Sequence, residues 1–293
     1  MELQFEKYHG LGNDFIMLDA EITAAAMSAA GTDLPALARR LCERRTGIGA
    51  DGLITVGRTD DGMLQMVIHN SDGSYASMCG NGIRCFGAYA LAHGFADDEE
   101  FPVITGAGLL SVKVLSKAPF TCEVYMGRPD FSPAAAGVAE SAGDAPLLRY
   151  EANLRGYGKV LLSTVFIGTY HTVVWMDAVT GAPELDDEDC MRAFCRALQA
   201  LPIFTEEQNI NMCLLTGKGE IAMRTYERGA GLTDACGTGA CAAAVIARAD
   251  GKAGDEVVIH LRRGDLRVRQ DGEDVYMSGP AERICCGTVA IDN

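Results

Sequence analysis

The chain has 293 residues, of which 48% are hydrophobic and 22% charged, and its net charge is −15. This length and apolar content predict a globular protein, with two domains favoured over one. A strongly acidic chain lacks the basic surface that nucleic acids and anionic membranes select, so we expect neither as a partner.

The sequence also indicates the compartment. No apolar run approaches the 18 residues of a membrane span, and the first residues lack the apolar core of a secretory signal. The eleven cysteines are an odd number and have no such signal before them. We therefore expect reduced thiols and a cytoplasmic protein.

The first half of the chain is predicted to be rich in strands, with two helices. The strands are expected at 3–9, 15–19, 53–56, 64–69, 109–115 and 121–126. The helices are expected at 34–44 and 80–92, and the second should end at His93-Gly94. Residues 129–146 hold three prolines and many alanines, which makes them the best linker candidate.

The second half is predicted to repeat this order. Strands are expected at 158–167, 172–176, 210–215, 220–226, 257–261, 266–268, 275–277 and 284–291, and helices at 186–200 and 237–249. The helices at 80–92 and 237–249 are apolar almost all round, which is typical of a buried helix. The sequence therefore predicts an α+β protein of two pseudo-symmetric domains. Each would wrap an antiparallel sheet or barrel around a central helix, with the active site in the cleft between them.

Both of these helices follow a cysteine. The first begins within Cys79-Gly-Asn-Gly82 and the second within Cys236-Gly-Thr-Gly239. The glycines let the backbone approach a ligand, and a helix start offers free N–H groups to a carboxylate. We expect the same field to lower the pKa of each thiol from its usual 8.5 or so.

Two such thiols on opposite faces of one carbon could remove a proton from one side and return one from the other. The repeated motif therefore predicts racemisation or epimerisation of an amino acid without a cofactor. Gly47-Ile-Gly-Ala-Asp-Gly52 matches a dinucleotide fingerprint, but a helix precedes it and a strand follows, which is the wrong order. The five histidines and the cysteine spacing show no zinc pattern, so we expect no metal.

The sequence resembles the diaminopimelate epimerase family over essentially its whole length. The resemblance rests on His9-Gly-Leu-Gly-Asn13-Asp-Phe15, Gly47–Gly52, Asn70-Ser-Asp-Gly-Ser74 and Cys79-Gly-Asn-Gly82, and on Tyr226-Glu-Arg-Gly-Ala-Gly231, Ala235-Cys-Gly-Thr-Gly-Ala-Cys241 and Met277-Ser-Gly-Pro-Ala281. It implies one domain of residues 1–130 to which 280–293 return, and another of 131–279. It also implies conversion of LL-2,6-diaminopimelate to the meso form, for lysine and peptidoglycan precursors. We carry a homodimer as a hypothesis.

The resemblance also implies residue roles. Cys79 and Cys236 would be the two acid/base thiols, and His171 and Glu227 would tune their pKa values. The substrate would be bound by Asn13, Asn70, Gly80, Asn81, Thr169, Asn209, Glu227, Arg228, Gly237 and Thr238. The chain has Thr169-Tyr170 where the family usually has Asn-Pro, and this departure concerns the distal end of the substrate.

Three alternatives stay open at this point. A racemase of another amino acid, such as histidine, would keep the mechanism and change the substrate. A thiol oxidoreductase would use Cys79 and Cys236 as a redox pair. A binding module would capture amino acids without turning them over, and the paired thiols would then have no purpose.

Overall fold

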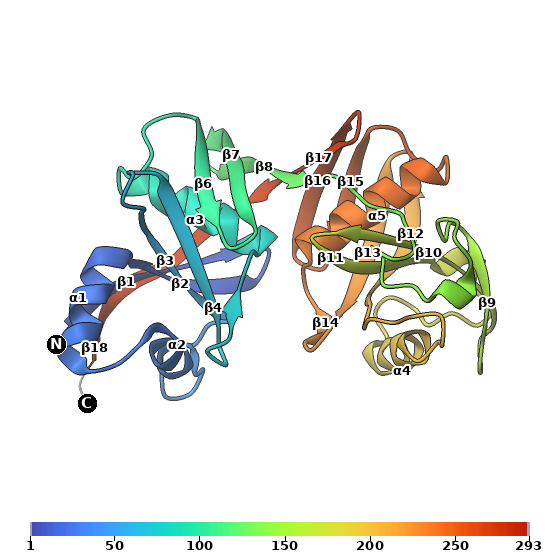
Figure 1. Cartoon of the computed structure of the whole chain (residues 1–293), viewed down its shortest axis with the longest axis horizontal. Helices are drawn as coiled ribbons and strands as arrows, with labels where there is room; N and C mark the ends of the chain where they lie inside the picture. Colours follow the sequence, from blue (N-terminus) through green and yellow to red (C-terminus); the bar gives the residue numbers. More distant parts are fainter. Residues whose placement is uncertain (1, 292–293) are drawn as a thin grey trace. The chain divides into compact units, whose positions relative to one another are not determined.

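The computed structural model describes residues 2–291, which form the two compact units drawn in Figure 1. One unit runs from the N-terminus to Val124 and resumes at Ser278, and the other comprises Tyr125–Met277. The chain therefore passes between the units twice, within strands β8 (Phe120–Gly127) and β17 (Asp274–Pro280). Within residues 2–291, no helix is long and apolar enough to cross a membrane.

The first unit is built around helix α3 (Gly80–Ala92). Every residue of α3 from Gly80 to Ala90 is buried, and the helix contacts β1, β2, β3, β4 and β7 (Figure 1). The strands of this unit are β1 (Glu2–Gly10), β2 (Asn13–Asp19), β3 (Gly52–Arg58), β4 (Leu64–Asn70), β5 (Tyr75–Ala76), β6 (Glu100–Thr105), β7 (Gly108–Lys117), β8 and β18 (Glu282–Ala290). Helices α1 (Ala20–Ala30) and α2 (Leu34–Cys42) pack against β2 and β3 through a cluster of buried apolar side chains that includes Leu37, Leu41 and Leu53.

The second unit is built in the same way around helix α5 (Gly237–Ala249). This helix is buried from Gly239 to Ala247 and contacts β10, β11, β12, β15 and β16 (Figure 1). The strands are β9 (Tyr150–Leu154), β10 (Gly158–Ile167), β11 (Thr169–Trp175), β12 (Asn209–Gly217), β13 (Glu220–Glu227), β14 (Gly231–Thr233), β15 (Glu256–Leu261), β16 (Gly264–Asp271) and β17. Helix α4 (Glu188–Gln199) covers a cluster of buried side chains, and short 3₁₀ turns lie at Glu140–Ala142 and Met176–Ala178.

The strand pairings of the two units correspond one to one. In the first unit β1–β2, β3–β4 and β6–β7 are antiparallel, whereas β2–β3 and β4–β6 are parallel. In the second unit β10–β11, β12–β13 and β15–β16 are antiparallel, whereas β11–β12 and β13–β15 are parallel. Strand β18 pairs with β1 as β9 pairs with β10. The chain therefore contains an internal duplication, with one copy of the same strand arrangement in each unit.

The expected α+β class with few helices is confirmed, but the sheets are mixed and not antiparallel throughout. Each parallel pair is separated in sequence by a connection that contains a helix: α1 and α2, α3, α4 or α5. Such long crossovers allow parallel pairing, which a short hairpin cannot.

Two further expectations were wrong or incomplete. The segment 129–146 is no linker, because Ala136 and Val138 are buried in the second unit and Gln208 donates a hydrogen bond to the carbonyl of Ala136. Helix α1 was missed, although Asp19 caps its start and Gly31 ends it with a left-handed backbone. Strands β5, β6, β9 and β14 were missed as well.

Candidate active site

Cys79 and Cys236 occupy the same position in their two units. Each is the N-cap of the central helix, and each sulfur accepts a hydrogen bond from the backbone N–H three residues on. The N–Sγ distances are 3.4 Å from Gly82 and 3.3 Å from Gly239. The backbone angles of both cysteines are extended, as a helix cap requires. Both motifs therefore begin buried helices, as the sequence predicts.

The strand registers extend this equivalence beyond the cysteines. Asn70 is the last residue of β4 and Glu227 the last of β13, and each precedes its cysteine by the same spacing. The parallel ladders align Phe15 with Gly52 and His171 with Asn209. Position by position, then, Asn13 corresponds to Thr169, Asn70 to Glu227 and Asn81 to Thr238.

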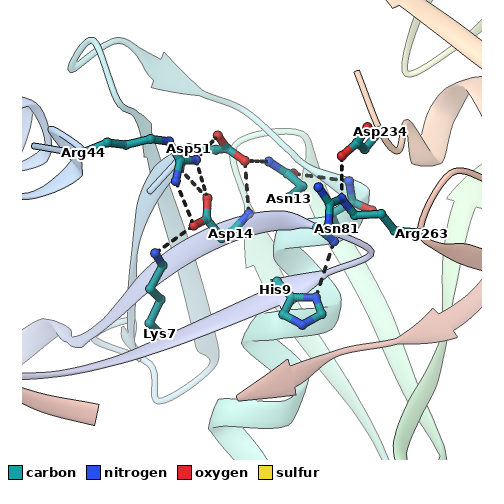
Figure 2. A network of polar contacts seen from close by, with 10 residues as sticks. Lys7, His9, Asn13, Asp14, Arg44, Asp51, Asn81, Asp234 and Arg263 are labelled. Atoms are coloured by element: carbon teal, nitrogen blue, oxygen red, sulfur yellow. Dashed lines mark hydrogen bonds and ion pairs between the residues drawn. The ribbon is translucent and has the colours of Figure 1, made fainter. Parts of the chain in front are cut away.

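In the first unit, Asn13 is the side chain beside the thiol. Its Oδ1 accepts from Cys79 Sγ at 3.6 Å and from Asn81 Nδ2 at 3.2 Å, while its Nδ2 donates to Asp51 Oδ2 at 2.8 Å. Figure 2 shows Asn13 between Asp51 and Asn81. Asn70 is exposed and donates to Ser74 Oγ at 2.9 Å, so it lies outside this chain of hydrogen bonds.

A cluster of charges holds Asp51 in place (Figure 2). Arg44 Nη2 contacts Asp51 Oδ1 at 2.7 Å and Asp14 Oδ1 at 2.8 Å, and Lys7 Nζ lies 2.8 Å from Asp14 Oδ2. Burial alone would raise the pKa of Asp14, but hydrogen bonds from Arg44 and Lys7 hold that pKa below its usual value. Asp51 therefore faces Asn13 from a network of ion pairs with Arg44 and Lys7.

In the second unit, a carboxylate and hydroxyls surround the thiol. Cys236 is buried, and its Sγ lies 3.5 Å from Thr238 Oγ1. Glu227 accepts from Thr233 Oγ1 at 2.5 Å and from the Cys236 thiol. Burial raises the pKa of the Glu227 carboxyl. This pair has no counterpart in the first unit, where Asn70 occupies the place of Glu227.

The expectation that the helix start lowers the thiol pKa is wrong for Cys236. Burial raises the pKa of this thiol well above its usual value, and the nearby Glu227 raises it further. Hydrogen bonds from Thr238 and from the backbone of Gly239 act in the opposite direction but are outweighed. Burial wins because a thiolate in an apolar interior loses its hydration, and a helix terminus returns only part of that free energy.

His171 is fully buried behind this site. Its Nδ1 lies 3.2 Å from Asn211 Nδ2, and Asn211 Oδ1 accepts from Thr225 Oγ1 at 3.0 Å. The amide of Asn211 therefore presents its N–H to the ring, which makes Nδ1 the acceptor and places the proton on Nε2. Burial lowers the pKa of His171 to about 3, so the ring is neutral.

The remaining predicted residues lie at the ends of β11, β12 and β13. Asn209 Oδ1 accepts from the backbone N–H of Arg228 at 2.8 Å, and the guanidinium carbon of Arg228 lies 5.9 Å from the centre of the Tyr170 ring. Thr169 is half-buried at the start of β11. A Cβ at Gly168 would lie 3.1 Å from Thr238, so the turn before Thr169 packs against the start of α5.

Sequence reasoning missed four polar residues that contact this machinery: Asp51, Arg84, Asn211 and Thr233. Two of them carried a usable signal, because Asp51 lies inside the Gly47–Gly52 motif and Arg84 lies two residues after the first cysteine motif. Asn211 and Thr233 are single polar residues in strands, and only the three-dimensional pairing reveals them.

Solved structures share the fold. A hydroxyproline epimerase from Agrobacterium vitis superposes with a TM-score of 0.69 at 15% identity, covering 99% of this chain and 92% of its own. A methylitaconate-delta-isomerase superposes with a TM-score of 0.63 at 15% identity, covering 99% of this chain and 95% of its own. At such identities the likeness shows the fold alone, and that fold is found among epimerases and isomerases.

Sequence comparison identifies the family. The family model described as diaminopimelate epimerase matches residues 5–132 and 163–284. The diaminopimelate epimerase of Moorella thermoacetica is 38% identical over 297 residues, covering 99% of this chain and 100% of the relative. That of Halothermothrix orenii is 35% identical over 298 residues, covering 99% of both chains. The chain belongs to the diaminopimelate epimerase family, and it is an isomerase.

Proposed function

We propose that this enzyme converts LL-2,6-diaminopimelate to the meso form without a cofactor, in the synthesis of lysine and peptidoglycan precursors. Cys79 and Cys236 are the two proton carriers. The observation that carries the proposal is the duplicated helix start, where each central helix has a thiol as its N-cap with the same hydrogen bond to the sulfur. One thiol in each half is what inversion at a single carbon requires.

The proton balance of the proposed reaction closes on the two sulfurs. The Cys79 thiolate takes the α-proton, which leaves a planar carbanion, and the Cys236 thiol returns a proton to the opposite face. The backbone N–H groups of Gly80, Asn81, Gly237 and Thr238, with the side chains of Asn81 and Thr238, bind the α-carboxylate and stabilise its developing charge. The product state has the protonation of the thiols exchanged, which prepares the enzyme for the reverse direction.

The direction of this first step follows from the electrostatics of the second unit. Because burial and Glu227 raise the pKa of Cys236, this thiol holds its proton in the resting enzyme. It therefore serves as the acid in the step that begins at Cys79. His171 is buried and neutral, so it adds no charge to the surroundings of the Cys236 thiol.

The distal amino-acid end of the substrate is assigned to residues at the strand ends. Arg228 is exposed and can form two parallel hydrogen bonds to a carboxylate, and Glu227 can pair with an ammonium group. Asn13, Asn70, Thr169 and Asn209 supply neutral donors and acceptors for the same end. A reducing compartment suits an enzyme with eleven cysteines, so we also propose a cytoplasmic location, with a homodimer as the working state.

A second substrate remains a candidate because of one local observation. Tyr170 lies beneath the guanidinium of Arg228, and its ring also packs edge-on against Phe166 at 5.5 Å between centroids. A bulky ring at this place narrows the region assigned to the distal end. This favours a smaller amino acid, or one with a flat side chain such as histidine, as the alternative substrate.

The test is α-proton exchange in D₂O with the purified enzyme. LL-diaminopimelate should gain one α-deuterium and yield the meso product, with no added cofactor. Exchange with L-histidine and none with diaminopimelate would replace the substrate and keep the mechanism. If neither these nor the other common amino acids exchanged, the proposal of a racemising enzyme would be wrong.

A further inference from the structure

Arg84 is a fully buried cation in the second turn of α3, and its guanidinium contacts the two residues that follow Cys79. Nη1 donates to the carbonyl of Gly80 and Nη2 to Asn81 Oδ1, each at 2.8 Å. Nε donates to the carbonyl of Pro280 at 3.1 Å. The guanidinium therefore connects the start of α3 to the end of β17.

The bond to Asn81 determines which way that amide faces. Because Oδ1 of Asn81 accepts from Arg84, its Nδ2 is directed to Asn13 Oδ1, at 3.2 Å. Asn13 is fixed at its other end by Asp51, to which its Nδ2 donates. Both ends of the Asn13 amide are thus specified, and its oxygen is the atom that faces the Cys79 sulfur, at 3.6 Å.

The backbone of β1 keeps the guanidinium in place. A Cβ added at Gly10 would lie 2.9 Å from Arg84 Nη2 and 3.2 Å from the carbonyl of Asn81. The strand therefore packs directly on the pair, and a residue with a side chain at this position would push the guanidinium away. This close packing makes Gly10 part of the same arrangement.

The second unit has no equivalent of this arrangement. At the position of Asn81 it has Thr238, whose hydroxyl lies near the Cys236 sulfur, and at the position of Arg84 it has Cys241. The two thiols are therefore supported differently. A neutral amide oxygen faces Cys79, whereas the carboxylate of Glu227 faces Cys236.

We propose that Arg84 is a positioning residue for the Cys79 thiol. Through Asn81 it sets the orientation of the Asn13 amide so that an acceptor faces the sulfur. The inference rests on the proposed function in that Cys79 acts as a proton carrier. With the amide reversed, an N–H would face the sulfur, stabilise the thiolate and weaken it as a base.

Asn81→Ala tests this without adding a charge beside the sulfur. The variant removes the N–H that Asn13 Oδ1 accepts, so the Asn13 oxygen is no longer held toward Cys79 and its Nδ2 can reach the sulfur. The alkylation rate of Cys79 by iodoacetamide at pH 7, measured by peptide mass spectrometry, should rise about tenfold. The rate at Cys236 in the same sample is the internal control and should stay the same.

A second variant keeps the proposal falsifiable if the first folds poorly. Arg84→Lys retains the charge but loses the fixed set of guanidinium N–H donors, so it should also raise the alkylation rate of Cys79. It should lower kcat for exchange about tenfold, with a smaller change in KM. Wild-type alkylation of Cys79 in both variants, or an equal rise at both thiols, would overturn the proposal. Alkylation is read without any substrate, so a failure of the proposed epimerisation would appear separately, as a wild-type enzyme that exchanges no amino acid.

Discussion

Glu227→Gln should make Cys236 more reactive, because it removes the negative charge that opposes the thiolate. The change preserves the shape of the side chain and its acceptor for Thr233. Two unit charges about 4 Å apart at an effective dielectric of about 20 interact by ~4 kcal/mol. The buried carboxyl of Glu227 itself favours protonation, so only part of this repulsion is realised. We therefore expect a gain of about tenfold in the thiolate population, well below the full repulsion.

The assay is the rate of iodoacetamide alkylation at pH 8, followed separately for the Cys236 and Cys79 peptides. The matched variant is Asn70→Glu, which installs a carboxylate at the equivalent position of the first unit. Glu227→Gln should accelerate Cys236 and leave Cys79 alone, and Asn70→Glu should slow Cys79 and leave Cys236 alone. Unchanged alkylation of Cys236 in Glu227→Gln would refute the assignment of Glu227 as a group that adds to burial in keeping this thiol protonated.

Three other perturbations follow from the second unit. His171 is neutral when folded, with a pKa of about 3 against about 6.5 unfolded, so its contribution to stability is complete above pH 6.5 and is lost as the pH falls toward 3. Chemical denaturation should therefore give a free energy of unfolding that is about 3 kcal/mol lower at pH 4.5 than above pH 6.5 because of this residue. The His171→Gln variant should show a weaker dependence of that free energy on pH, and an equally strong dependence would contradict the reasoning. Gly239→Ala places a methyl against Asn211 Oδ1 and should lower the stability by about 1–3 kcal/mol and remove most of the exchange activity. In Gly82→Ala the methyl meets the movable end of the Ile54 side chain at 3.0 Å, so the loss of stability should be smaller. Equal shifts of the melting temperature in the two variants would count against this. Tyr170→Pro should lower KM for LL-diaminopimelate severalfold with little change in kcat, and an unchanged KM would show that the ring does not narrow the distal region.

Much of the fold could be predicted because the two central helices have an unusual composition. Helices apolar on every side can only be buried, and each begins after a Cys-Gly-x-Gly motif that marks its start. The mixed sheets could not be predicted, because parallel and antiparallel strands have the same alternation of side chains. Helix α1 escaped notice since its alanine-rich sequence lacks a strong amphipathic pattern, although Asp19 and Gly31 mark both of its ends.

Part of the candidate site could also be predicted from the sequence, and part could not. The resemblance to the family singled out Asn13, Glu227 and Thr238, and the structure shows that each contacts a thiol or lies beside one. The high pKa of Cys236 was beyond reach, because it depends on how completely the folded chain buries the sulfur. Arg84 lies two residues after the first Cys-Gly-x-Gly motif, but its function depends on which atoms of Asn81 it contacts.

The central claim, that each thiol serves one face of one carbon, is tested by α-proton chemistry in single-thiol variants. Cys79→Ala and Cys236→Ala should each abolish interconversion of LL- and meso-diaminopimelate in D₂O, while Cys190→Ala, which removes an exposed thiol, should leave it intact. Circular dichroism of all three variants establishes that they are folded. Full interconversion by either Cys79→Ala or Cys236→Ala would contradict the two-thiol mechanism.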